Sequence, residues 1–300
     1  MDQKHEQRSD TGARNLLLAS LLNVLITLAE IIGGILSNSL ALLSDALHNL
    51  SDTLAVLLAY FARRIGKRRS NERKTFGYKR IEILAAFINA IVLLGISLFL
   101  VFESIKRFYD PEPVKGLLMF IVATAGLIFN LAAVLLLKDH SHGNLNVRSA
   151  YLHLLGDTFS SVAVIIGGIL IYFWEVYWVD PLVTILISIY IIKEAYPVFK
   201  EAADILMQGT PKDIDITSAI RDLENINGIA NIHHVHVWSL SDNQYHFECH
   251  AELDLDLPVS QTNVILSAIE KILVEKYGIG HVTVQFEYGN LHDHAAIHHG

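Results

Sequence analysis

The chain has 300 residues, of which 52% are hydrophobic and 18% are charged, and its formal net charge is −8. The apolar residues stand in long blocks, which favours a membrane protein over a soluble globular one, and the single cysteine, Cys249, excludes an intrachain disulfide framework. Residues 1–13 form a polar N-terminal tail, and the apolar block that follows is too long for a cleavable signal peptide.

Six apolar segments of membrane-spanning length follow this tail, since a helix needs about 20 residues to cross a bilayer. These segments are 14–36, 40–62, 80–102, 115–137, 146–173 and 181–203. Asp180-Pro181 predicts the start of the last helix, with aspartate as its N-cap. The sequence therefore predicts an all-α membrane bundle of six helices over residues 14–206.

Basic residues indicate how these segments are oriented. Nine Lys and Arg residues lie between Arg63 and Arg80, with Glu72 as the only acid, whereas the loops near 37–39 and 174–180 contain none. The positive-inside rule then places the 63–79 loop and both termini in the cytoplasm. Because a juxtamembrane position explains this charge, no nucleic-acid partner is expected, and binding to anionic lipid is an alternative interpretation.

The pattern changes after Gly209 to that of a soluble domain over residues 207–290. Helices are predicted at 213–226 and 260–277, and strands at 229–240, 244–255 and 281–287. This order predicts a small two-layer α+β domain whose helices cover one face of a sheet. Residues 291–300 form a His-rich tail.

Two pairs with the same spacing, His48/Asp52 and His153/Asp157, lie within predicted membrane helices. Residues four apart share a helix face, and ionisable groups at membrane depth cost about 2.5–3.5 kcal/mol each on insertion scales. Packing of polar residues between helices would not require matching pairs. The spacing therefore predicts an intramembrane zinc site with two histidine and two aspartate ligands, and Asp45, one turn before His48, is a candidate supporting partner.

The predicted site lacks a thiolate, whereas closed structural zinc sites commonly use cysteine. Histidine and aspartate must both lose their protons to bind metal, so protons compete with the ion. Histidine titrates near neutral pH, which favours an exchange of metal for protons.

Other histidines are weaker candidates. His140 and His142, in the loop before the fifth span, could bind metal loosely or lie in solvent. On the predicted strand 229–240, strict alternation places His234 and His236 on the face of Ile232, opposite His233. On the predicted strand 244–255, His246 and His250 share one face. Ordinary surface or core histidines are the alternative to a cytoplasmic metal site here.

Several motifs together give the chain a strong family resemblance. They are Ser44-Asp-Ala-Leu-His-Asn-Leu-Ser-Asp52, Thr75-Phe-Gly-Tyr-Lys-Arg80, His153-Leu-Leu-Gly-Asp157, Asp180-Pro181 and His234-Val-His-Val-Trp-Ser-Leu240. Over nearly its whole length the chain resembles the cation diffusion facilitator family, in its branch of bacterial zinc, cadmium and cobalt exporters and their animal zinc-transporter relatives.

The resemblance implies six spans, a cytoplasmic ferredoxin-like domain, a homodimer in a bacterial inner or plasma membrane, and exchange of divalent metal for protons. It also implies that His48, Asp52, His153 and Asp157 are the transport ligands and that their composition favours zinc.

The sequence departs from some relatives at two further metal sites. The 63–79 loop has no His, Asp or Cys, so the additional loop site of some members is predicted to be absent. Of the family's binuclear cytoplasmic site, His233 and His250 match, but the last-strand His and Asp positions fall on Gln285 and Glu287. The candidate ligands of a structural or regulatory zinc are therefore His233, His234, His236, His250 and Glu287.

These observations predict a secondary transporter that removes Zn²⁺, and also Cd²⁺ or Co²⁺, from the cytoplasm and confers metal tolerance. A membrane-anchored metal sensor is one alternative, resting on the histidines of the C-terminal domain. An intramembrane metallohydrolase is the other, but the sequence lacks a His-Glu-x-x-His motif.

Overall fold

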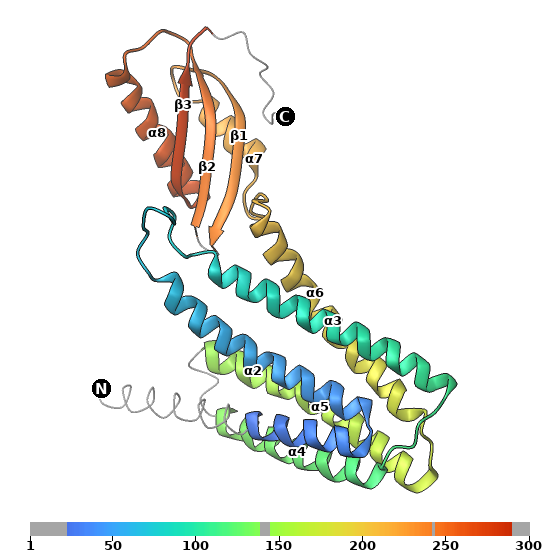
Figure 1. Cartoon of the computed structure of the whole chain (residues 1–300). Coiled ribbons are helices and arrows are strands. Elements are labelled where there is room, and N and C mark those ends of the chain that lie inside the picture. Colours follow the sequence, from blue (N-terminus) through green and yellow to red (C-terminus); the bar gives the residue numbers. More distant parts are fainter. Residues whose placement is uncertain (1–22, 139–144, 242–243, 290–300) are drawn as a thin grey trace, which may run out of the picture. The chain divides into compact units, whose positions relative to one another are not determined.

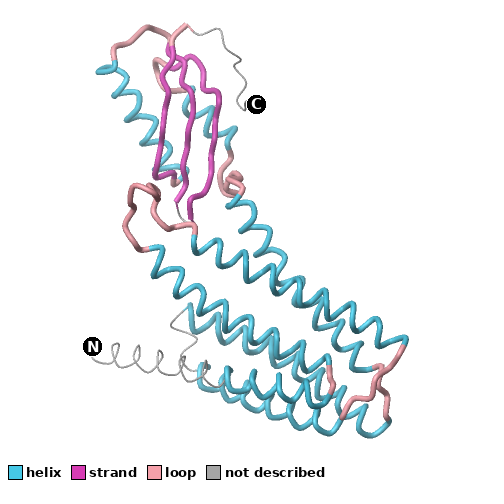
Figure 2. Tube along the Cα trace, viewed as in Figure 1, coloured by secondary structure: helices cyan, strands magenta, loops and turns pink. Residues whose placement is uncertain are grey.

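The structure is a computed structural model that describes residues 23–138, 145–241 and 244–289 (Figure 1). They group into two compact units. The first unit consists of the residues up to Tyr60 together with Ile88–Phe199. The second unit consists of Phe61–Phe87 together with the residues from Lys200 onward. Among the described residues, the part of the chain before residue 207 consists of helices and the loops between them, and all strands follow residue 228 (Figure 2).

Each of the six predicted apolar segments contains a helix among its described residues. These helices are Asn23–Ser37, α2 (Leu40–Gly66), α3 (Ile81–Tyr109), α4 (Gly116–Lys138), α5 (Leu145–Trp174) and α6 (Val179–Leu206). Of the described residues, Ile81–Tyr109, Asp157–Trp174 and Val179–Leu206 are each long and apolar enough to cross a membrane, and Asn23–Ser37 and Gly116–Ala132 are shorter apolar helices. Large apolar side chains are widely exposed on these helices, as expected of surfaces that face lipid.

Glycines allow close approach between helices in the first unit. A Cβ atom added at Gly168 of α5 would lie 2.9 Å from the backbone nitrogen of Phe120 in α4. One added at Gly33 would lie 2.8 Å from the side chain of Val122, also in α4. Both glycines belong to an Ile-Ile-Gly-Gly-Ile-Leu segment, which occurs at residues 31–36 and again at 165–170, and in both places they serve helix packing.

The start of α2 is held by a carboxylate from α6. Asp180, which is fully buried, accepts hydrogen bonds from Ser39 Oγ at 2.5 Å and from the Leu40 backbone nitrogen at 2.9 Å. Ser39 Oγ in turn accepts a hydrogen bond from the Leu42 backbone nitrogen at 3.1 Å, as an N-cap does. The prediction that Asp180 caps its own helix is thus wrong, because α6 begins at Val179 and the carboxylate instead binds the free N–H groups of α2.

The turn between the helix Asn23–Ser37 and α2 is fixed by a second polar cluster. Asn38 has a left-handed backbone conformation (φ 58°), and its carbonyl oxygen accepts a hydrogen bond from Arg107 Nη1 at 2.7 Å. Glu112 Oε2 accepts from Asn38 Nδ2 at 2.9 Å and lies 3.1 Å from Arg107 Nη2. These contacts with Asn38 and Arg107 lower the pKa of Glu112.

The second unit contains an α+β domain with the predicted order of elements. This order is α7 (Ile216–Glu224), β1 (Ile229–Ser241), β2 (Gln244–Leu253), α8 (Val259–Tyr277) and β3 (Ile279–Glu287). The sheet order is β1-β2-β3, with β1 antiparallel and β3 parallel to β2. The two helices contact each other and the sheet, so both cover one face (Figure 1). Leu223, Phe247, Ile269 and Ile279 lie in the core between them.

A β-bulge interrupts β1 at its histidines. His233 pairs with His250 and His236 with Glu248, so β1 has one residue more than β2 between these pairs. His234 takes a left-handed conformation (φ 51°) within the bulge. The predicted strict alternation is therefore wrong here: Ile232 and Val235 both enter the core, because the extra residue reverses the phase of the strand.

Candidate metal sites

His48 of α2 lies close to two aspartates, one on its own helix and one on α5. Its Nε2 atom is 3.5 Å from Asp52 Oδ2 and 3.5 Å from Asp157 Oδ1. The shared face predicted from the four-residue spacing brings His48 to Asp52, and antiparallel packing brings α5 to the same place. Three of the four residues predicted to bind metal in the membrane domain therefore meet.

These separations suit two ligands of one ion. They exceed the usual N–H···O distance, which is about 2.9–3.0 Å. Zinc binds imidazole nitrogen and carboxylate oxygen at about 2.0–2.1 Å, and two ligand atoms at the corners of such a tetrahedron are about 3.3–3.4 Å apart. The imidazole of His48 is thus spaced from each of the two carboxylates as two ligands of one zinc ion would be.

The surroundings of the site are largely closed to solvent. His48 and Asp157 are 5% and 2% exposed, whereas Asp52 is partly exposed. The ring of Tyr190, from α6, packs edge-on to the His48 ring with centroids 6.1 Å apart. Two carboxylates beside one imidazole, of which that of Asp157 is buried, concentrate negative charge, which favours binding of a cation.

Asp45 joins the same two helices one turn away from His48. Its carboxylate accepts hydrogen bonds from Ser160 Oγ and, at 3.3 Å, from Ser161 Oγ, both on α5. Asp45 is 1% exposed. Sequence reasoning missed the two serines, although they follow Asp157 by three and four residues and so share its helix face.

His153 lies on α5 one turn before Asp157, as its spacing predicts, but its side chain is outside the described part of the structure. The helix backbone places its Cα on the same face as that of Asp157.

A further polar contact reaches the helix Asn23–Ser37. Glu30 is fully buried, and its Oε2 atom accepts a hydrogen bond from Asn49 Nδ2 at 3.1 Å. Asn49 follows His48 directly, so this contact holds α2 against the first described helix. Gly126 of α4 provides the space, since a Cβ atom there would lie 2.4 Å from Glu30 Oε1.

The C-terminal domain brings together a second group of candidate ligands. His233, His250 and Glu287 offer ligand atoms that all lie within 4.8 Å of one another. His250 Nδ1 is 2.8 Å from Glu287 Oε1, and His233 Nε2 is 3.5 Å from Glu287 Oε2. The other ring nitrogen of His233 lies 3.0 Å from Asn231 Oδ1, the kind of contact that orients a metal-binding histidine.

The other candidate histidines are placed as follows. His234 stacks on His250 with ring centroids 4.6 Å apart, and His236 packs edge-on to His234 at 5.0 Å. Both therefore border the group of three without belonging to it. His140 and His142 lie outside the described residues.

Cys249 is unsuited to metal binding, since it lies in the sheet core. Burial and the neighbouring Glu248 raise the pKa of its thiol to about 12. It therefore stays protonated, as a structural residue does.

Two sequence families match the chain. Residues 16–207 match the family described as the cation efflux transmembrane domain, and residues 211–288 match the cation efflux protein cytoplasmic domain. The chain therefore belongs to the cation efflux family, whose members are membrane transporters and not enzymes.

Curated relatives are similar over nearly their full length. The chain is 40% identical over 296 residues to a cadmium, cobalt and zinc/H(+)-K(+) antiporter of Bacillus subtilis, covering 98% of this chain and 95% of the relative. It is 39% identical over 285 residues to the zinc transporter ZitB of Escherichia coli, covering 94% and 90%. It is 35% identical over 274 residues to the metal cation efflux system protein CzcD of Cupriavidus metallidurans, covering 91% and 86%.

Proposed function

We propose that this protein exports Zn²⁺, and also Cd²⁺ or Co²⁺, from the cytoplasm in exchange for protons. The transported ion binds to His48, Asp52, His153 and Asp157. The observation that carries the proposal is the approach of His48 Nε2 to Asp52 and Asp157 at 3.5 Å each. The names of the relatives support the choice of metals.

The donor set suits an ion that must be released as well as bound. Two imidazole nitrogens and two carboxylate oxygens satisfy the tetrahedral preference of zinc. Without a thiolate, the site holds soft metals less tightly than a cysteine site does. Asp45 supports the site by tying α2 to α5 through Ser160 and Ser161.

Proton exchange follows from the same ligands. Each ligand must lose its proton before it binds the ion, so loading with metal releases protons and protonation releases metal. Histidine is the side chain whose ordinary pKa, about 6.5, lies within the physiological pH range. We assign the exchanged protons to His48 and His153.

In the proposed topology all six helices cross the membrane and both termini are cytoplasmic. α2 carries the ionisable residues Asp45, His48 and Asp52, and we place these side chains toward the interior of the bundle. The nine basic residues between Arg63 and Arg80 then lie on the cytoplasmic side. The proposed membrane domain covers residues 14–206, after the tail 1–13.

We propose that residues 207–290 form a cytoplasmic domain with a ferredoxin-like fold, followed by the tail 291–300. We propose that it forms a homodimer, in which a regulatory zinc ion binds to His233, His250 and Glu287. The separations within this group and the orienting contact of Asn231 support a metal here. A metal sensor that does not transport is the competing function that this group would support.

Zinc flux into liposomes that contain the purified protein tests the proposal. With zinc outside and a zinc-sensitive dye inside, an outward proton gradient should accelerate zinc entry, and zinc entry should in turn drive protons out. A protonophore that collapses the gradient should remove the acceleration. Zinc flux that ignores the gradient would contradict proton exchange, and absence of zinc flux in every condition would indicate a sensor.

A further inference from the structure

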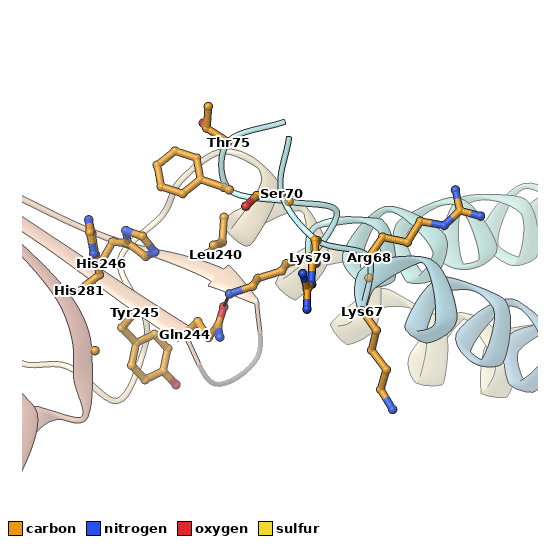
Figure 3. Close-up of a pocket in the computed structure, with 15 residues that line it drawn as sticks. Lys67, Arg68, Ser70, Thr75, Lys79, Leu240, Gln244, Tyr245, His246 and His281 are labelled. Atoms are coloured by element: carbon orange, nitrogen blue, oxygen red, sulfur yellow. Dashed lines mark hydrogen bonds between the residues drawn. The ribbon is translucent and has the colours of Figure 1, made fainter. Parts of the chain in front are cut away.

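The second compact unit contains a cavity of about 810 Å³ that is not part of either candidate metal site. It is lined by the segment that follows α2, from Gly66 to Lys79, and by residues of all three strands (Figure 3). Its basic side chains are Lys67, Arg68, Arg69, Lys79, His246 and His281. No carboxylate lies among the described residues that line it, although the chain as a whole has a net charge of −8.

The segment that forms one wall of this cavity has a fixed local structure. Asn71 Oδ1 accepts hydrogen bonds from the backbone nitrogens of Arg73 at 3.0 Å and Lys74 at 2.9 Å. Asn71 Nδ2 also donates to Tyr78 Oη at 3.2 Å, and Gly77 takes a left-handed conformation (φ 77°). The basic side chains therefore project from an ordered turn.

Lys79 is held in the cavity by β2. Its Nζ atom donates a hydrogen bond to Gln244 Oε1 at 2.5 Å (Figure 3). This bond uses one of the three ammonium donors and leaves others for a ligand. In the same view Lys67 and Arg68 extend away from the strands, so they lie at the outer rim (Figure 3).

His246 supplies a buried polar atom to the cavity wall. The residue is 6% exposed, and its Nδ1 atom has no hydrogen-bond partner among the described residues. The His246 ring contacts three other rings. The distance between ring centroids is 5.3 Å to Trp238, 5.4 Å to Phe76 and 4.5 Å to His281. Burial, with His281, Lys79 and Arg80, lowers the pKa of His246. The charges around this ring are thus positive, which favours an anion over a metal ion.

We propose that this cavity binds a phosphate group, with Lys79, His246 and His281 as its inner contacts and the basic rim as the source of long-range attraction. Ammonium and imidazole N–H groups both form charge-assisted hydrogen bonds to phosphate oxygens. The group can belong to an anionic lipid headgroup or to a soluble phosphate compound, since both present the same chemistry. A topology signal alone would need basic charge on this side of the membrane but would not need Gln244 or a buried histidine.

Binding measurements on the full-length protein test the proposal with two probes. Calorimetric titration of the metal-free protein in a neutral detergent with pyrophosphate, at constant ionic strength, reports binding of a soluble phosphate. Native mass spectrometry after addition of phosphatidylglycerol or phosphatidylcholine reports binding of a lipid phosphate. We expect one of the two anionic probes to bind, and phosphatidylcholine not to be retained.

Variants separate the cavity from general charge attraction. Lys79→Gln should weaken binding about tenfold, the loss of one hydrogen bond to a charged group. Arg73→Gln and Lys74→Gln remove equal charge from the same segment without touching the cavity, and should change affinity by less than about twofold. His246→Asn should also weaken binding of the probe. If this buried substitution prevents folding, the comparison of Lys79→Gln with the two control variants tests the proposal by itself. Equal losses in the cavity and control variants would overturn the proposal, and so would the failure of both anionic probes to bind.

Discussion

His48 Nε2 lies 3.5 Å from Asp157 Oδ1, and this contact joins the first half of α2 to α5 through two buried ionisable side chains. A contact of this length is too long for a good hydrogen bond and close to the edge of a zinc tetrahedron. The same two helices are joined again by Asp45 with Ser160 and Ser161. These contacts bring three carboxylates and one imidazole to the same two helices, the donor types that the proposed cation site uses.

Asp180 should control stability, because its carboxylate binds N–H groups at the start of α2. In Asp180→Asn, an amide group would replace one of the two acceptor oxygens that face these donors. We expect the free energy of unfolding to fall by about 1–3 kcal/mol, the cost of leaving a buried donor without a partner. Thermal unfolding of the purified protein in detergent measures the change.

Asp110→Asn is the matched control for this substitution, because Asp110 is exposed. Its melting temperature should equal that of the unchanged protein. An Asp180→Asn variant that melts with the control would contradict the capping role.

Asp45 should tune the transport site without being one of its ligands. Loss of such an outer hydrogen-bonding partner typically costs about 10–100-fold in metal affinity or activity. We therefore expect Asp45→Asn to raise the zinc KM while leaving measurable maximal flux, with Ser160→Ala acting in the same direction.

The double variant Asp45→Asn/Ser160→Ala checks whether the two residues act together. It should lose less than the sum of the two single effects, since both changes break one contact. Additive losses would indicate that Asp45 acts through some other group, and complete loss of flux in Asp45→Asn alone would make it a ligand.

The positions of the helices and strands follow from local signals that the sequence carries. Apolar length marks the membrane helices, and alternation with turn residues marks the strands of the C-terminal domain. The four-residue spacing of His48 and Asp52 also predicts that they share a helix face, and the two side chains do lie close together. His48 additionally contacts Asp157 on a second helix, α5.

Contacts that join distant parts of the chain could not be predicted in the same way. Asp180 resembles an ordinary N-cap in sequence, yet its carboxylate reaches the start of α2, 140 residues earlier. The bulge at His234 reverses the phase of β1, and one extra residue leaves no mark in an alternating pattern. The pairing of His281 with His246 is not visible in the sequence either, because the two residues belong to different strands.

The cytoplasmic group should bind zinc without being required for transport. His250→Ala or Glu287→Gln should lower the number of zinc ions bound per chain, as counted by elemental analysis, while zinc flux continues. His236→Ala, which removes an exposed histidine outside the group of three, is the control and should leave the count unchanged. An unchanged count in His250→Ala would contradict a zinc site here.

His246 should titrate below the ordinary histidine value of 6.5, because burial, His281, Lys79 and Arg80 disfavour its charged form. As pH falls from 6.5 through the lowered pKa, the unfolded chain binds more protons than the folded one, so stability decreases in that window. Above pH 6.5 both states are neutral and His246 has no effect.

NMR titration of the full-length protein with isotope-labelled histidine measures this pKa. Lys79→Gln should raise it, and a bound phosphate probe should raise it further, because an anion favours the charged ring. A pKa at or above 6.5 in the unliganded protein would contradict the described surroundings of His246.

The central claim is that His48, Asp52, His153 and Asp157 hold one transported ion, and it is tested most directly by zinc binding at this site alone. In a His233→Ala/His250→Ala/Glu287→Gln background, X-ray absorption should detect one zinc ion with nitrogen and oxygen ligands at about 2.0–2.1 Å. Adding Asp157→Asn should abolish both this ion and zinc flux, whereas adding Asp110→Asn should preserve both. Retention of the bound ion and of zinc flux in the Asp157→Asn variant would contradict the account.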